Sequence, residues 1–100
     1  MQTFKELIRS DKPVLVDFYA DWCGPCKAMT PVLQQFKQEM GDAITIIKIN
    51  VDKQPQAAQA YGVQGIPTFI VFQKGDIKWR HAGMISAGDL KAAVAPLAEG

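Results

Sequence analysis

The sequence has few of the residues that cross-link small proteins or bind metals, with only two cysteines and one histidine among 100 residues. Two cysteines cannot build the multi-bridge framework of a small secreted domain, and a bridge from Cys23 to Cys26 closes too small a loop to add much stability. Tetrahedral zinc needs four ligands, and only His81 could join the cysteines besides carboxylates. The cysteines are therefore expected to serve chemistry, with a zinc-binding module as the less favoured alternative.

The sequence also has almost no excess of one sign of charge and no long apolar run. Lysine and arginine exceed aspartate and glutamate by one, 11 against 10, and neither sign forms a long run, so no nucleic-acid partner is expected. No apolar stretch approaches the roughly 18 residues of a membrane span, and the charged N-terminus lacks the apolar core of a secretory signal. We expect a cytoplasmic protein without membrane partners, although an exported protein whose signal had been removed would look the same.

The composition and the apolar periodicity indicate a single α/β domain over residues 1–100. Hydrophobic residues make up 48% and charged residues 21%, an ordinary globular mixture, and the length allows one core. Turn residues and apolar spacing divide the chain into alternating helices and strands. The expected elements are helices over 3–9, 23–40, 55–61 and 86–98 and strands over 14–19, 44–50, 68–73 and 77–82. The first two strands are predicted to be buried and parallel and the last two to form a hairpin, giving a central mixed sheet of about four strands flanked by helices.

Cys23 and Cys26 stand two residues apart where the first strand gives way to the long helix. At a helix N-terminus, unpaired backbone amides and the helix dipole favour a thiolate over a thiol. Cys23 is therefore predicted to be the nucleophile. Cys26 lies one turn further in, where we expect it to be less exposed and to resolve a mixed disulfide formed at Cys23. The predicted reaction is dithiol–disulfide exchange.

The segment WCGPC at residues 22–26 resembles the active-site motif of thioredoxins, and the similarity runs from about residue 3 to residue 98. Further matching residues are Val16-Asp17-Phe18, Lys27, Pro31, Lys48, Gly65-Ile66-Pro67-Thr68 and Gly83. The resemblance implies the thioredoxin fold and an enzyme that reduces protein disulfides through a reversible Cys23–Cys26 disulfide, with no metal or organic cofactor. It also implies regeneration by a thioredoxin reductase, and we expect a monomer. Gly24 and Pro25 between the cysteines match the reducing members of the family.

Asp17 is an acidic residue within an otherwise apolar strand. Burial without a partner is costly for a carboxylate, so desolvation is expected to raise its pKa, which suits a proton acceptor for Cys26. The resemblance implies the same catalytic role. The alternative is that Asp17 points to solvent at a sheet edge. A lysine on a strand is usually solvated, and only the resemblance suggests that Lys48 approaches Asp17.

A peptide-binding groove is implied by the resemblance, with a cis Pro67 that faces the cysteines. The apolar contact surface around it would comprise Trp22, Gly24, Pro25, Ile66 and Gly83. A binding module that uses this surface regardless of redox state is a second hypothesis, which the presence of both cysteines disfavours. The chain departs from many thioredoxins at Tyr19, where tryptophan is common. Many thioredoxins also have an additional N-terminal strand, which the short N-terminus is expected barely to supply.

Overall fold

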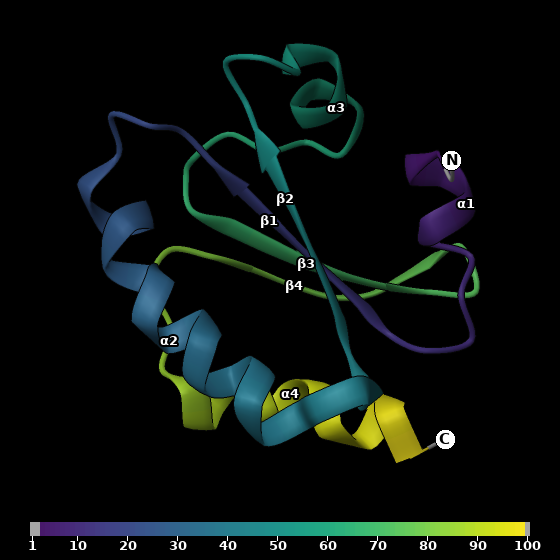
Figure 1. Ribbon diagram of the computed structural model, residues 1–100. Helices are drawn as coiled ribbons and strands as arrows, with labels where there is room; N and C mark the ends of the chain where they lie inside the picture. Colours follow the sequence, from purple (N-terminus) through teal and green to yellow (C-terminus); the bar gives the residue numbers. More distant parts are fainter. Residues whose placement is uncertain (1–2, 100) are drawn as a thin grey trace.

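The order of helices and strands in the computed structural model matches the predicted order over residues 3–99, which the structure describes (Figure 1). The elements are α1 (Phe4–Leu7), β1 (Val14–Tyr19), α2 (Gly24–Met40), the 3-10 turn η1 (Gly41–Ala43), β2 (Thr45–Asn50), α3 (Pro55–Ala60), β3 (Thr68–Gln73), β4 (Asp76–Ala82) and α4 (Ala87–Glu99). Helix α1 ends two residues earlier than expected. No helix in this range is long and apolar enough to cross a membrane.

The four strands form one mixed sheet in the order β2-β1-β3-β4. Strands β1 and β2 are parallel, whereas β3 is antiparallel to both β1 and β4, as predicted. The β3–β4 hairpin turns through Lys74 and Gly75, whose φ angles are 55° and 86°. Two consecutive positive φ angles give a turn whose twist matches that of the flanking strands.

Helices cover both faces of the sheet, and the sheet separates the core into two layers (Figure 1). On one face, α2 and α4 pack against Leu15 of β1 and Phe69 of β3. This layer contains the predicted core residues Met29, Val32, Phe36, Leu90 and Val94. On the other face, α1 and α3 cover the side chains that alternate with these along the strands, such as Val16 and Ile70. Side chains of β1 with odd numbers thus face α2.

Strand β2 differs from the expectation of a fully buried strand. It lies at the edge of the sheet, where residues 45–47 are half-buried and Lys48 is exposed. Its isoleucines indicated burial on both faces, but an edge strand has a neighbour on one side only. The strand order, which depends on long-range pairing, therefore decided the burial of β2.

Helix α2 carries the cysteine motif and has defined ends. Cys23 is its N-cap and Pro25 lies in its first turn, where a missing amide hydrogen costs nothing. Gly41 ends the helix with a φ of 57° and a ψ of −130°, a backbone conformation that side-chain-bearing residues avoid. Pro31 lies within the helix, which continues past it to Met40.

Replacing Gly41 by alanine is expected to lower the free energy of unfolding by about 1–2 kcal/mol, because the positive φ is strained for any residue with a Cβ. A Cβ would meet no atom within 4 Å, so the cost is conformational and disulfide reduction should be unchanged. Chemical denaturation measures the effect. Gly88→Ala is the matched control, because Gly88 is helical and alanine there should be neutral or stabilising. Equal effects of both substitutions would contradict this account.

Candidate active site

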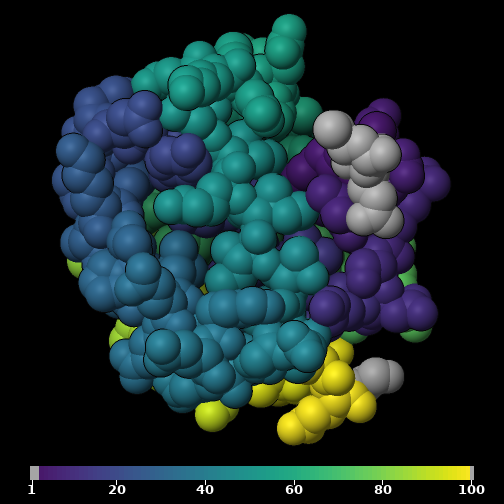
Figure 2. Space-filling model, viewed as in Figure 1, coloured from purple at the N-terminus to yellow at the C-terminus, as the bar shows by residue number. Residues whose placement is uncertain are grey.

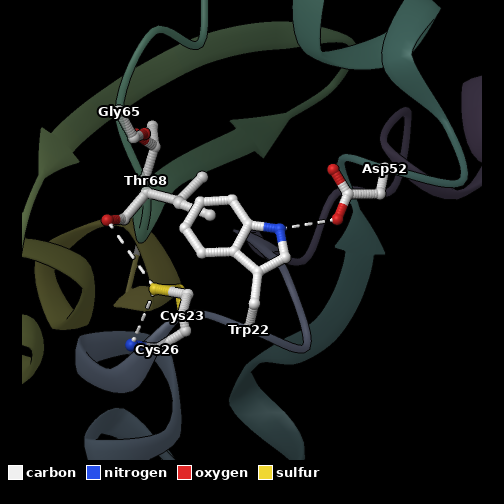
Figure 3. Close-up of a disulfide and its surroundings, with 7 residues drawn as sticks. Trp22, Cys23, Cys26, Asp52, Gly65 and Thr68 are labelled. Atoms are coloured by element: carbon white, nitrogen blue, oxygen red, sulfur yellow. Dashed lines mark hydrogen bonds between the residues drawn. A yellow bond between two sulfur atoms is a disulfide. The ribbon is translucent and has the colours of Figure 1, made fainter.

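Cys23 and Cys26 form a disulfide at the start of α2, with their Cα atoms 5.3 Å apart (Figure 3). The Cys23 Sγ accepts a hydrogen bond from the Cys26 backbone N–H at 3.1 Å. Cys23 thus caps the helix with its sulfur, as serine or threonine caps other helices with oxygen. A backbone amide and a helix dipole placed in this way favour a thiolate over a thiol at Cys23 when the disulfide is reduced.

Burial does not distinguish the two cysteines in the way the sequence predicted. Cys23 is 3% exposed and Cys26 is 7% exposed, so the expectation that Cys26 would be the less exposed was wrong. The reason is the segment before β3, whose Ile66 carbonyl oxygen lies 3.9 Å from the Cys23 Sγ. Both cysteines are covered in the disulfide, and the cap hydrogen bond is what makes them unequal.

The segment containing Pro67 lies directly against the cysteines. The Ile66–Pro67 peptide bond is cis, as the family resemblance implied. The half-buried Ile66 packs against the cluster of Ala20, Cys23 and Cys26, and Pro67 is buried. The Pro67 carbonyl accepts a hydrogen bond of 2.8 Å from the Gly83 N–H, which brings Gly83 to the same rim. Residues 66, 67 and 83 are thus brought to the site.

The exposed part of the predicted contact surface comes from the motif itself. Trp22 is 70% exposed, and Gly24 and Pro25 are also exposed. The Trp22 indole Nε1 donates a hydrogen bond of 2.8 Å to Asp52 Oδ2, and Figure 3 shows the ring lying beside the disulfide. A large apolar side chain held at the surface next to the reactive sulfurs is a suitable contact for a polypeptide substrate.

Asp52 was missed by the sequence interpretation, together with Asn50, which orders the loop that carries it. The Asn50 Oδ1 accepts the Asp52 N–H at 2.9 Å, and its Nδ2 donates to Asp21 Oδ2 at 3.4 Å. The sequence carried a signal for these residues, because β1 and β2 were predicted to be parallel. Tyr19 at the end of β1 pairs with Asn50 at the end of β2. Polar residues that follow two parallel neighbouring strands meet at one edge of the sheet.

Removing the Asp52 carboxylate is expected to release the Trp22 indole and weaken substrate binding. Asp52→Ala should raise the KM for a protein disulfide about threefold with little change in kcat, because one partly solvated hydrogen bond is lost. Tryptophan fluorescence anisotropy in a Trp79→Phe background should fall. Asp52→Asn keeps an acceptor oxygen and serves as the control. An unchanged KM and anisotropy in Asp52→Ala would contradict the prediction.

Asp17 is buried in the centre of β1, so the alternative of a solvent-facing carboxylate was wrong. It is 2% exposed, and its Oδ1 has no hydrogen-bond partner among the described residues. It faces α2, because it lies two residues along β1 from both Leu15 and Tyr19, which pack on the α2 side. Desolvation by burial raises the pKa of Asp17 to about 6, and the nearby positive charge of Lys48 opposes part of this rise.

Lys48 stands opposite Asp17 in the parallel pairing of β1 and β2, so the approach that the resemblance suggested is present. Within the described residues 3–99, the Lys48 ammonium does not form an ion pair with the Asp17 carboxylate. The Nζ instead lies 4.9 Å from the centroid of the Tyr19 ring. Lys48 therefore acts on Asp17 through space rather than by a direct hydrogen bond.

The zinc alternative has no support in the geometry. His81 stacks on Trp79 and its Nε2 lies 3.2 Å from the Met84 carbonyl, which accounts for it as a surface residue of β4. In the part of the chain that the structure describes, no group of three or more histidine, cysteine or acidic side chains could hold a metal ion.

A disulfide at a helix N-terminus, a sulfur that caps the helix and a cis-proline segment against the sulfurs together define a thiol-disulfide oxidoreductase. Its redox group is the Cys23–Cys26 pair itself. The thioredoxin family model matches residues 1–96, and the chain belongs to the thioredoxin family. Members of this family are protein-disulfide oxidoreductases, and this chain is an enzyme of that kind.

Individual relatives agree with this assignment. Thioredoxin 1 of Chlorobaculum tepidum is 49% identical over 85 residues, covering 84% of each chain. The chloroplastic thioredoxin Y of Oryza sativa is 45% identical over 89 residues, which are 88% of this chain but 53% of that relative. A solved structure of a mutant thioredoxin from Halobacterium salinarum has a TM-score of 0.84 at 36% identity and covers 100% of this chain and 89% of that one.

Proposed function

We propose that the chain works in the cytoplasm as a monomeric general reductant of protein disulfides, which a thioredoxin reductase returns to the dithiol state. The observation that carries the proposal is the Cys23 Sγ held as a helix cap by the Cys26 amide. This arrangement favours a thiolate, the form that attacks disulfides. The Gly24-Pro25 pair between the cysteines supports the reducing direction. The cytoplasmic location is proposed from the sequence, and cell fractionation would test it.

In the first step, the Cys23 thiolate attacks one sulfur of the substrate disulfide. A bond forms between the Cys23 Sγ and that sulfur while the substrate S–S bond breaks, and the departing substrate sulfur leaves as a thiolate that takes up a proton. Trp22 and the cis Pro67 segment would hold the substrate chain during this attack. The Trp22 ring beside the disulfide and the Ile66 carbonyl oxygen 3.9 Å from the Cys23 Sγ support this role.

In the second step, Cys26 resolves the mixed disulfide. Asp17 would accept the proton of the Cys26 thiol, and the resulting thiolate attacks the Cys23 Sγ. The Cys23–Cys26 disulfide forms, and the second substrate sulfur leaves as a thiolate that takes up the proton held by Asp17. Two electrons have then passed to the substrate, together with the Cys26 proton and one proton from water. A carboxylate with a pKa of about 6 is a better proton acceptor near neutral pH than an ordinary aspartate. Lys48 would tune this acceptor.

The function is tested by reduction of insulin, a model protein disulfide, with NADPH and a bacterial thioredoxin reductase. We expect NADPH oxidation that depends on the chain, and none in a Cys23→Ser/Cys26→Ser double variant. The alternative is a redox-independent binding module. It would be supported if the double variant bound partners as fully as the parent and the parent showed no turnover. Size-exclusion chromatography with light scattering tests the monomer.

A further inference from the structure

Tyr19 at the end of β1 contacts the charged end of Lys48 on the edge strand β2. The Lys48 Nζ lies 4.9 Å from the centroid of the Tyr19 ring. An aromatic ring attracts a cation placed over its face. An exposed lysine on an edge strand otherwise has many rotamers available, which would carry its charge into solvent. The ring therefore restricts where the Lys48 charge is found.

The same two side chains line a cavity of about 390 Å³ that reaches Cys26. The other residues around it are Ala20, Asp21, Lys27 and Thr30. Figure 2 shows this side of the molecule hollowed between α2, in blue, and the teal segment that contains β2. The Lys48 ammonium is thus held at a cavity that leads to the resolving cysteine.

The charge of Lys48 acts on Asp17, its partner in the β1–β2 pairing, and lowers the pKa of the carboxyl against the larger effect of burial. The neighbouring strand β3 contributes the uncharged Phe69 beside Asp17. Other titratable groups on this face are Cys26 and Lys27 at the start of α2, Lys37 further along α2, Asp21 at the rim of the cavity and His81 on β4. Lys37 lines a second cavity together with Lys48. Among these groups, Lys48 is the one whose charged end is positioned by the Tyr19 ring.

We propose that Tyr19 is a positioning residue for disulfide exchange, whose ring holds the Lys48 ammonium beside Asp17 while Cys26 resolves the mixed disulfide. The proposal rests on the role of Asp17 as acceptor of the Cys26 proton. Without the ring, the ammonium spends less time near Asp17, so a smaller fraction of Asp17 is ionised around its midpoint. Fewer Asp17 carboxylates are then available to take the Cys26 proton.

The test compares Tyr19→Leu, which removes the ring, with Tyr19→Phe, which keeps it and loses only the hydroxyl. Each is made in the parental chain and in a Lys48→Met background. NMR titration of the Asp17 carboxyl carbon and the pH profile of insulin reduction are measured. Tyr19→Leu should raise the Asp17 midpoint and lower the rate about twofold at pH 6. Tyr19→Phe should behave as the parent, and Tyr19→Leu should have no further effect when Lys48 is absent.

An unchanged Asp17 midpoint in Tyr19→Leu, or an equal change with and without Lys48, would overturn the proposal, because the ring would not be acting through the ammonium. If Tyr19→Leu does not fold, Tyr19→Trp decides, since the larger ring attracts cations more strongly and should lower the midpoint only when Lys48 is present. Failure of the underlying function is distinguishable: the parental chain would not reduce insulin, or Asp17→Asn would exchange at the parental rate.

Discussion

Replacing Cys23 by serine is expected to reduce protein-disulfide reduction to the uncatalysed level. The serine hydroxyl is a poor nucleophile near neutral pH without an adjacent base, and the helix cap that stabilises a thiolate gives it no comparable activation. Insulin reduction with dithiothreitol or a reductase measures the loss. Circular dichroism should show a folded protein, because serine is itself a good N-cap.

Cys26→Ser is expected to fail in a different way. The Cys23 thiolate still attacks the substrate, but no internal thiolate remains to resolve the mixed disulfide. The variant should accumulate covalent complexes that appear on a non-reducing gel and disappear with added dithiol. If Cys23→Ser trapped partners and Cys26→Ser did not, the roles of the two cysteines would have to be exchanged.

Asp17→Asn should lower the rate of disulfide exchange at least about tenfold near neutral pH, since an amide cannot accept the Cys26 proton. The loss should lie in the resolving step. Rapid mixing with a chromogenic aromatic disulfide measures both steps, because attack by Cys23 and resolution by Cys26 each release one coloured thiolate. Parental release rates across neutral pH would contradict the proton-acceptor role of Asp17.

The same substitution should make the domain more stable, with a defined pH dependence. Burial raises the pKa of Asp17 from 3.8 to about 6, so between these values the folded chain binds more protons than the unfolded chain. The free energy of unfolding of the parent therefore falls as pH rises through this window, by about 3 kcal/mol in all. Asp17→Asn has no carboxyl to titrate, so its free energy of unfolding should not fall in this way. It should exceed that of the parent most above pH 6 and only a little below pH 4.

Urea denaturation at pH 3.5, 5 and 7 would show this difference between parent and variant. Asp76→Asn, at an exposed position at the start of β4, is the control and should leave the pH dependence in place. A variant that is less stable than the parent at pH 7 would mean that the Asp17 carboxylate is well solvated or paired in the folded state.

Much of this protein was determined by the sequence itself, because local signals were strong. Alternating apolar residues, proline and glycine placed nearly every element within one or two residues of its observed end. The cysteine spacing at a strand-to-helix junction predicted the redox pair. The assignment of Cys23 as its nucleophile stays a prediction. The acidic Asp17 in an apolar strand predicted a buried carboxylate, since a strand with apolar residues on both faces leaves it little access to water.

Only the tertiary structure decided the features that depend on residues far apart in the chain. The strand order placed β2 at the edge and so exposed Lys48, and the packing of Ile66 over Cys23 made both cysteines buried. The contacts of Trp22 with Asp52 and of Tyr19 with Lys48 likewise join separate elements. Residue periodicity reports which face of an element is apolar, whereas the identity of its neighbours depends on how the whole sheet pairs, and that pairing is set by the collective packing of the core.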